Sequence, residues 1–566
     1  MSRRAATCAI IVLFALSSIS IVPLRAASPG AALVTSGELR EWLTYIASDE
    51  LQGRATYSEG LGLAASYIGE HLREWGVKPG GDHGSYLQAV SVLGVKSTSH
   101  SSVTVRVGRE SRTFKDGEGV TFPKYSGGKR MFTLDHVEFA GYGLDVPAIN
   151  HVDFRGKDVK GAAVVYLGLN GPRGFDAQVY RALLAYRDRY VTDGLQASAL
   201  IGPQLAPSSS GSSGRGTQAA AAAGRTPPRV VPDFTTSRRL DLPKAPTITA
   251  GDEFYAFLFS QAPQHYDELK RRADAQDTLP SFALKDVTIT FHVDTDYEVL
   301  RTQWTHNVVG IVDGGDPELK STYVAFGAHY DHLGYADGAL PPFGALSPPA
   351  AGRVNPGAPD DRIWNGADDD GSGTVAVMAL AHAFANGPRP KRSLLFVWHA
   401  GEELGTYGSL YYADHPTVPI DRVVTQLNID MIGRNRNDDP AEANTVYLVG
   451  SDRISSELDQ ISREADHDLA APLTIDYEMN DLSDPEQIYY RSDHYSYAEK
   501  GIPVIFFTTG LHPDYHTNSD DVTRILFDKL TKVAQLVYET GARVANLDHA
   551  PVRDHQGARA GKGTRQ

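Results

Sequence analysis

Four short apolar runs in the second half of the chain, each followed by acidic residues or histidines, constrain the fold most strongly. Runs of this length and composition are typical of strands that are buried on both faces of a sheet. In open α/β sheets, ligands bind beyond the carboxyl ends of the strands. We therefore expect the polar residues after the runs to meet in one site. The runs are 322–326, 394–398, 423–429 and 502–507.

Helical patterns alternate with these strand patterns, which indicates a mainly parallel, mixed sheet with helices on its faces. The expected fold class is α/β, a three-layer α/β/α sandwich. Apolar periodicity predicts helices at 373–384, at 454–465 and from 522 to about 544. Near the start of the chain, Ser36 is expected to cap another helix.

The N-terminus has the pattern of a signal peptide. Arg3 and Arg4 precede an apolar stretch at 8–22, and small residues follow at 26–28. An N-terminal membrane anchor is the alternative, although the apolar stretch is short for a membrane span. The only cysteine, Cys8, would leave with the signal, so no disulfide is expected in the mature chain. We expect export to the periplasm or the medium.

The charge and the length of the chain restrict its possible partners and its number of domains. The net charge of -15 argues against a nucleic-acid-binding role, which usually shows a basic face. The length of 566 residues favours two or three domains. From about residue 132 to 285 the sequence is rich in strand patterns and holds no acid or histidine cluster, so a separate, non-catalytic domain is expected there.

Five side chains near the ends of the runs form a ligand set for two divalent cations. Zinc accepts histidine and carboxylate ligands, and catalytic zinc sites keep a position open for water. Cobalt or manganese also suits such ligands. The expected assignment, provisional in its division, is Asp369 as the bridge, His329 and Asp430 toward one cation, and Glu403 and His516 toward the other.

Each of these residues alone also has a structural explanation. A single histidine at a strand end is usually a satisfied polar residue, and three acids before a Gly-Ser-Gly sequence can simply cap a helix. Asp430 is harder to explain in this way, because an unpaired charge at the end of a buried strand is costly. The joint pattern is much more specific than any of its parts.

Three further residues are predicted to act in catalysis. Glu402 is expected to take a proton from the attacking water and pass it to the leaving amine. Asp331 is expected to accept the second N–H of the His329 ring and fix its orientation. Tyr515 is expected to donate a hydrogen bond to the oxyanion, with ordinary packing as the alternative.

The remaining residues near the motifs have no assigned role. His332 and His399 have no partner in this scheme, and Asp493 and His494 are expected to shape the pocket or support the ligands. The His-Glu-x-x-His helix, the Gly-x-Ser-x-Gly turn and phosphate-binding glycine loops are not found in the sequence. Other hydrolase mechanisms therefore lack their parts.

At these motifs the sequence resembles the two-zinc aminopeptidase family that also contains glutamate carboxypeptidases and glutaminyl cyclases. In that family the bridging aspartate stands three residues before the Ser-Gly pair, which selects Asp369. The likeness covers about residues 300 to 545, and the β-rich stretch resembles a protease-associated domain. The matching motifs, in order, are Gly-Ala-His-Tyr-Asp at 327–331, Gly-Ala-Asp-Asp-Asp-Gly-Ser-Gly at 366–373, Ala-Gly-Glu-Glu-Leu-Gly at 400–405, Asn-Ile-Asp-Met at 428–431 and Tyr-His-Thr at 515–517.

The resemblance implies a secreted metallo-exopeptidase with two zinc ions per chain that removes N-terminal residues from peptides. A carboxypeptidase acting on acidic C-termini and a non-catalytic binding protein are the alternatives. A peptide is the expected partner, without nucleic acid or stable membrane association, and the oligomeric state and the preferred side chain stay open.

The resulting division of the chain has five parts. It consists of a signal peptide at 1–26, the N-terminal part of the peptidase domain at 27–131, an inserted protease-associated domain at 132–285 with a mobile loop at 207–224, the zinc peptidase domain at 286–548 and a flexible tail at 549–566.

Overall fold

The computed structural model describes residues 28–204, 233–236, 238–336 and 352–555. The predicted signal peptide at 1–26, the predicted loop at 207–224 and the end of the predicted tail at 556–566 lie outside the described residues. Within the described ranges, no helix is both long and apolar enough to cross a membrane.

The first sheet contains all four predicted strands as neighbours. Its centre runs in the order β20, β17, β21, β24, and these strands pair in parallel, whereas β16 and β22 join the two sides antiparallel. The prediction of a mixed sheet is thus confirmed, and most of its parallel pairing lies in this centre. In spatial order the strands are β12 (Asp233–Thr235), β2 (Leu87–Ser99), β16 (Thr295–Val312), β20 (Ser393–His399), β17 (Tyr323–His329), β21 (Val423–Ile429), β24 (Val504–Thr508), β22 (Thr445–Val449) and β23 (Thr474–Asp476), with β1 (Lys78–Pro79) paired to β16.

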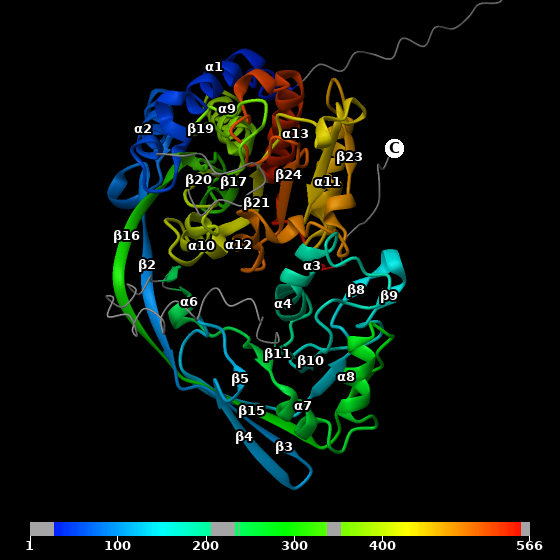
Figure 1. The fold of residues 1–566 in the computed structure, drawn as a ribbon. Coiled ribbons are helices and arrows are strands. Elements are labelled where there is room, and N and C mark those ends of the chain that lie inside the picture. Colours follow the sequence, from blue (N-terminus) through cyan, green and yellow to red (C-terminus); the bar gives the residue numbers. More distant parts are fainter. Residues whose placement is uncertain (1–27, 205–232, 237, 337–351, 556–566) are drawn as a thin grey trace, which may run out of the picture.

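Alternate residues of each strand point to opposite faces of this sheet. Helices pack against the apolar side chains on both faces. Phe326 packs on one face against Phe384 of α9, with ring centres 5.5 Å apart, whereas Ala325 belongs to a second cluster on the other face with Tyr412 of α10. The predicted three-layer sandwich is confirmed (Figure 1). The first face carries α1 (Ser36–Ile46), α2 (Glu59–Glu74), α9 (Gly373–Asn386), α11 (Ser456–His467) and α13 (Phe527–Asn546), and the second carries α10 (Tyr407–Asp414) and α12 (His494–Ala498).

The cap of α1 differs from the prediction by one residue. The Thr35 hydroxyl accepts the Glu38 N–H at 3.3 Å, and Ser36 is already the first helical residue. Thr35 has the extended backbone that a cap residue needs, so it satisfies an N–H that the helix leaves free.

A second, β-rich lobe is built around another sheet of ten strands (Figure 1). This sheet already includes β3, β4 and β5, so it takes in residues 102–121, which the predicted division placed in the peptidase domain. The identity of this lobe as a protease-associated domain stays a prediction. Its strands, in spatial order, are β14 (Ser281–Ala283), β7 (Val137–Ala140), β10 (Ala163–Val165), β11 (Ala199–Pro203), β13 (Thr247–Ala250), β5 (Gly119–Thr121), β4 (Glu110–Asp116), β3 (Ser102–Val107), β15 (Val287–Val293) and β6 (Arg130–Leu134).

Short elements complete the chain. The β-rich lobe also has α3 (Arg181–Ala185), α4 (Arg187–Arg189), α6 (Arg238–Asp241), α7 (Asp252–Leu258) and α8 (Tyr266–Asp274). Two small sheets pair β8 (Asp145–Val146) with β9 (His151–Val152) and β18 (Gly334–Tyr335) with β19 (Ile363–Trp364).

A two-stranded ribbon joins the lobes. Strands β2 and β16 pair antiparallel from Leu87↔Val308 to Ser99↔Thr295, and the last residues of β16 pair with β20 in the first sheet. The ribbon runs along one side of the molecule from the first sheet to the second (Figure 1). The chain therefore leaves and re-enters the first lobe on adjacent strands.

The buried carboxylate of Asp466 on α11 makes stability depend on pH. Burial raises the pKa of Asp466 from 3.8 to about 6, while its Oδ1 accepts the Leu473 N–H at 2.8 Å. The folded state therefore holds this proton more tightly than the unfolded state, and the resulting stabilisation is lost as the pH rises from about 4 through 6. At pH 7.5, Asp466→Asn is expected to be more stable than wild type by about 1 to 2 kcal/mol, a value reduced for partial exposure, and near-equal at pH 4.

Thermal unfolding midpoints of wild type and Asp466→Asn at both pH values measure this difference. Glu464→Gln removes an exposed carboxylate from the same helix and serves as the control. An Asp466→Asn variant with the same relative stability at both pH values would contradict the assignment.

Candidate metal centre

The five predicted ligands converge at the carboxyl edge of the first sheet. Strand β17 ends at His329, and Asp430 follows the last residue of β21 directly. Glu403 lies in the loop after β20, Asp369 in the turn Ala367–Ser372 before α9, and His516 in the loop after β24. Because β17, β20, β21 and β24 are parallel neighbours, these loops meet at one edge, as the sequence predicts.

Asp369 lies between two groups of side chains. Its Oδ1 is 3.2 Å from Nε2 of His329, which in turn is 3.8 Å from an Asp430 carboxylate oxygen. Its Oδ2 is 3.1 Å from Nε2 of His516, which is 3.2 Å from an oxygen of Glu403. The two oxygens of one carboxylate thus face two different pairs of ligands.

The chemistry of this cluster fits divalent cations. Within the described part of the chain, Oδ2 of Asp369 and Oε1 of Glu403 are buried and accept no well-aligned hydrogen bond, although ring nitrogens of His516 and His332 lie 3.1 and 2.8 Å from them. Leaving such carboxylate oxygens unsatisfied is costly unless a cation completes their environment. Two groups of residues are spaced closely enough to hold an ion, namely His329, Asp370 and Asp430, and His332, Asp369 and Glu403.

Attraction between carboxylates and histidines shifts the pKa values of both in this cluster. Burial would lower the pKa of His329, but the Asp430 carboxylate, with Asp331 and Asp369, raises it well above its ordinary value. Burial would raise the pKa of Glu403, yet His516 and His332 lower it to about 2. The site is therefore organised to hold carboxylates ionised beside positive charge.

His332 has a contact that the sequence did not reveal. This fully buried side chain places Nδ1 2.8 Å from Oε1 of Glu403 and 3.8 Å from Asp369. The expectation that His332 has no partner is wrong. Its position three residues after His329, in a loop leaving the same strand, was the available signal.

Asp370 is satisfied by the backbone. Its carboxylate accepts the N–H groups of Gly373 at 2.8 Å, His329 at 3.1 Å and Met431 at 3.3 Å. These bonds tie the start of α9 to the ends of β17 and β21. The contacts of Asp370 therefore indicate a structural role more than those of Asp369 do.

The turn that carries Asp369 is fixed by buried partners. Gly366 has φ +58°, and a Cβ there would lie 2.4 Å from the Asp369 carbonyl and from the His332 ring, so only glycine fits. The fully buried Arg54 donates to the carbonyls of Asn365 at 2.7 Å and Gly366 at 2.9 Å. Asp520 accepts the Asp369 N–H at 3.0 Å.

Asp331 contacts His329 differently from the expectation. The nearest acceptor to the second ring nitrogen of His329 is the main-chain carbonyl of Asp331 at 3.1 Å, while its carboxylate is 3.7 Å away. That carboxylate accepts the Thr56 hydroxyl at 2.7 Å and the Glu402 N–H at 3.2 Å. Asp331 thus links the His329 loop to the main chain at Glu402.

Glu402 lies beside the ligands in a small cavity of about 40 Å³. Burial, with a further contribution from Glu403, raises its pKa well above the ordinary range, so Glu402 binds a proton far more readily than a solvated carboxylate. Among the described residues, the cavity also contacts the apolar side chains of Met431, Met479, Ile488, Phe506 and Leu511.

Tyr515 stacks on His516 with ring centres 3.9 Å apart, and it lines the same cavity. Burial raises the pKa of Tyr515 to about 12, so its hydroxyl stays protonated at neutral pH. Arg491 lies within 3.4 Å of this hydroxyl and pairs with Glu486 at 2.8 Å.

The remaining candidate residues, His399, Asp493 and His494, have other buried partners. His399 is 3.0 Å from the Tyr497 hydroxyl and 3.5 Å from Asp493, and burial lowers its pKa to about 3. Burial raises the pKa of Asp493 to about 7. His494 packs against Phe506, with ring centres 4.9 Å apart. Among the described residues, neither His399 nor His494 belongs to a group that could hold a cation.

The similarity to known proteins lies in the part of the chain that carries this site. Residues 307–541 match Peptidase family M28. Aminopeptidase YwaD of Bacillus subtilis (strain 168) is 28% identical over 179 residues, which cover 30% of this chain and 36% of that protein. Leucine aminopeptidase 1 of Trichophyton equinum is 26% identical over 241 residues, or 41% of this chain and 56% of that protein. The matched part thus spans about a third to just over half of these curated relatives.

Solved structures give a looser likeness. An aminopeptidase from Aneurinibacillus sp. strain AM-1 aligns with a TM-score of 0.41 at 18% identity, over 95% of this chain and 97% of that one. A zinc aminopeptidase from Bacillus subtilis aligns with the same TM-score at 17% identity, over 92% of this chain and 98% of that one. The matched family segment contains all five predicted ligands and Glu402, and the predicted resemblance is confirmed by the match of residues 307–541 to Peptidase family M28.

Proposed function

We propose that this chain is an exported zinc aminopeptidase that removes N-terminal residues from peptides at a centre of two zinc ions. The observation that carries the proposal is the position of Asp369, whose two carboxylate oxygens face His329 on one side and His516 on the other. Asp430 and Glu403 complete the two sides. When bound, the zinc ions supply Lewis acidity and lower the pKa of water.

The protein's own residues move the proton. Glu402 accepts a proton from the attacking water and donates it to the leaving amine, a transfer favoured by its raised pKa. The Asp331 carboxylate holds the main chain of Glu402 through the bond to its N–H. The Tyr515 hydroxyl, kept protonated by its pKa of about 12, donates to the oxyanion.

The cavity favours an N-terminal residue with an apolar side chain. Met431, Met479, Ile488, Phe506 and Leu511 offer apolar surface, and the carboxylates of Asp369 and Asp430 offer negative charge to a free amine. The relatives include a leucine aminopeptidase of Trichophyton equinum, and its name fits this preference.

A carboxypeptidase is the second candidate, and Arg491 is the observation that favours it. Among the described residues that line the cavity, Arg491 is the only arginine or lysine, and a C-terminal carboxylate would need such a group. Its guanidinium already pairs with Glu486 at 2.8 Å, which weakens this alternative.

Zinc-loaded protein is tested on leucyl-p-nitroanilide, its N-acetylated form, and an N-blocked peptide with a free glutamate at its C-terminus. Hydrolysis of the free-amine substrate alone supports the aminopeptidase. Cleavage of the N-blocked peptide would instead establish the carboxypeptidase, and no cleavage by folded, zinc-loaded protein would favour a non-catalytic binding role.

The finer parts of the proposal concern export and architecture. The N-terminal pattern at 1–26 supports a cleaved signal peptide, and the β-rich lobe between the ribbon strands supports an inserted domain. The mass of the secreted chain, compared with the mass expected after cleavage near residue 26, tests the signal.

A further inference from the structure

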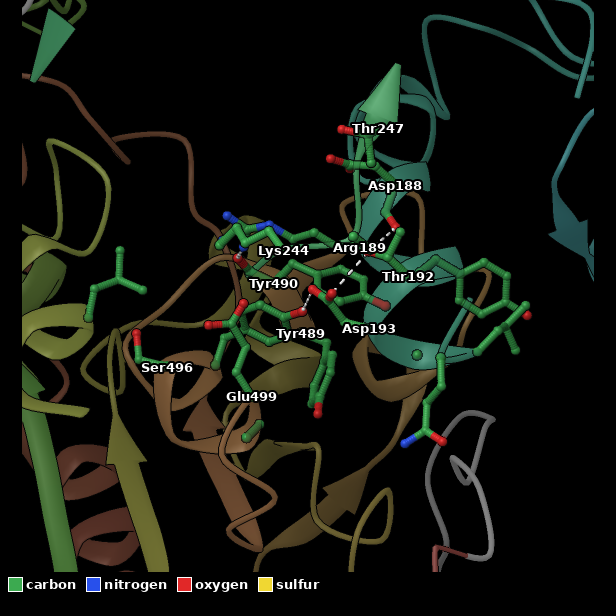
Figure 2. A pocket seen from close by; sticks show the side chains of 18 of the residues that line it. Asp188, Arg189, Thr192, Asp193, Lys244, Thr247, Tyr489, Tyr490, Ser496 and Glu499 are labelled. Carbon is green, nitrogen blue, oxygen red and sulfur yellow. Dashed lines mark hydrogen bonds between the residues drawn. The ribbon is translucent and has the colours of Figure 1, made fainter. Parts of the chain in front are cut away.

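The β-rich lobe contacts the first lobe through α4 and the turn Tyr190–Gly194 that follows it. Arg189 donates a hydrogen bond to the main-chain carbonyl of Tyr490 at 3.1 Å, and the Tyr186 ring stacks on the Tyr490 ring with centres 5.8 Å apart. The Tyr495 hydroxyl donates to the Asp193 carboxylate at 2.5 Å. These contacts lie beside a cavity of about 890 Å³ between the lobes, in which Arg189, Asp193 and Tyr490 are close together (Figure 2).

The segment held in this way also forms a wall of the metal site. We call residues 488–492 the catalytic wall. Ile488 and Arg491 line the small cavity that contains Glu402, whereas Tyr489, Tyr490 and Ser492 line the cavity between the lobes. The wall therefore separates the two cavities.

The catalytic wall also contacts residues that have roles in the proposed reaction. The Ser492 hydroxyl donates to the metal-ligand candidate Asp430 at 2.7 Å, and it accepts from the Asn428 side chain at 3.0 Å. Arg491 lies within 3.4 Å of the Tyr515 hydroxyl. A shift of the wall would move Ile488 and Arg491 relative to Glu402.

Regular structure supports the wall only weakly. It begins with a single 3₁₀ turn at Ile488–Tyr490, and the preceding Gln487 has φ 50°. Short 3₁₀ turns have poorer hydrogen-bond geometry than α-helices. Side-chain contacts from outside the segment are therefore needed to fix its position.

We propose that Arg189, with Tyr186 and Asp193 beside it, is a positioning residue that holds the catalytic wall in place from the β-rich lobe. Arg189 does not line the cavity that contains Glu402, and it acts through the Tyr490 carbonyl. The β-rich lobe then contributes to the geometry of the metal site through the position of the catalytic wall. This inference rests on the proposed aminopeptidase function.

The test compares three zinc-loaded variants with wild type. Arg189→Met removes the hydrogen bond and the charge, Arg189→Lys keeps a charged donor, and Arg181→Met is a matched control on an exposed residue of α3. Arg189→Met is expected to raise KM for leucyl-p-nitroanilide about tenfold with kcat within about threefold of wild type, because a small misplacement weakens substrate positioning. Arg189→Lys is expected to recover part of the loss, and Arg181→Met to leave KM unchanged.

Hydrogen–deuterium exchange gives a readout that needs no activity. Peptides covering 486–495 are expected to exchange faster in Arg189→Met than in wild type, with the rest of the first lobe unchanged. Unchanged exchange and KM in Arg189→Met would overturn the inference, as would a general loss of zinc and thermal stability, which would show only a structural role. If wild type cleaves no substrate, the proposed function fails, and faster exchange confined to 486–495 would still establish that Arg189 positions the wall.

Discussion

Glu402→Gln is expected to lower kcat by about a hundred- to ten-thousandfold, the range that a positioned general base contributes. Gln has the same shape as Glu but cannot accept the proton of the attacking water. Because burial already raises the pKa of Glu402, replacing it with a neutral amide is not expected to destabilise the fold. Steady-state kinetics on leucyl-p-nitroanilide, zinc content and the thermal midpoint are measured together.

Glu403→Gln is the matched comparison, because the two carboxylates are adjacent but are assigned different roles. Glu403, which lies 3.2 Å from His516 and 2.8 Å from His332, is expected to lose zinc as well as activity when it is changed. Equal loss of zinc in both variants would show that Glu402 is a ligand rather than the base.

Asp369→Asn is expected to abolish activity and to weaken zinc binding more than about a hundredfold, beyond the usual effect of losing a partner behind a ligand. Asp369 is the residue whose two oxygens reach toward both His329 and His516. An amide presents only one oxygen, and its NH₂ group would repel a cation on the other side. Zinc per chain, measured by mass spectrometry after dialysis, is expected to fall from two to below one.

Asp370→Asn is the control on the neighbouring carboxylate. Asp370 accepts three backbone N–H groups, so its change is expected to lower thermal stability while zinc is retained. Loss of zinc in Asp370→Asn with retention in Asp369→Asn would exchange the two roles. That outcome is possible because Asp370 belongs, with His329 and Asp430, to a group that could hold a cation.

The sequence predicted the centre of the fold well because the signals there are local and strong. Apolar runs marked β17, β20, β21 and β24, and parallel pairing brought the residues that follow them to one edge. The convergence of His329, Asp369 and Glu403 could therefore be expected from the order of motifs along the chain.

Contacts between distant segments could not be predicted in the same way. The approach of His332 to Glu403 and the bond from Arg189 to Tyr490 depend on how loops pack, and no periodicity records them. The start of the β-rich lobe was predicted at 132 rather than near 102, because strands such as β3 look alike in either lobe. The choice of Thr35 rather than Ser36 as the cap depends on the extended backbone of Thr35, which the sequence does not reveal.

The ribbon of β2 and β16 has a consequence for how such a chain can be rearranged. Ser99 and Thr295 are paired partners, so the two ends of everything between them lie only about 5 Å apart, the usual separation of opposed residues in antiparallel strands. A tight turn could join them into a hairpin without disturbing the pairing of β16 with β20. The β-rich lobe is in this sense inserted at one pair of adjacent strands, although it also contacts the first lobe through β12 on β2, Arg189 and Asp193.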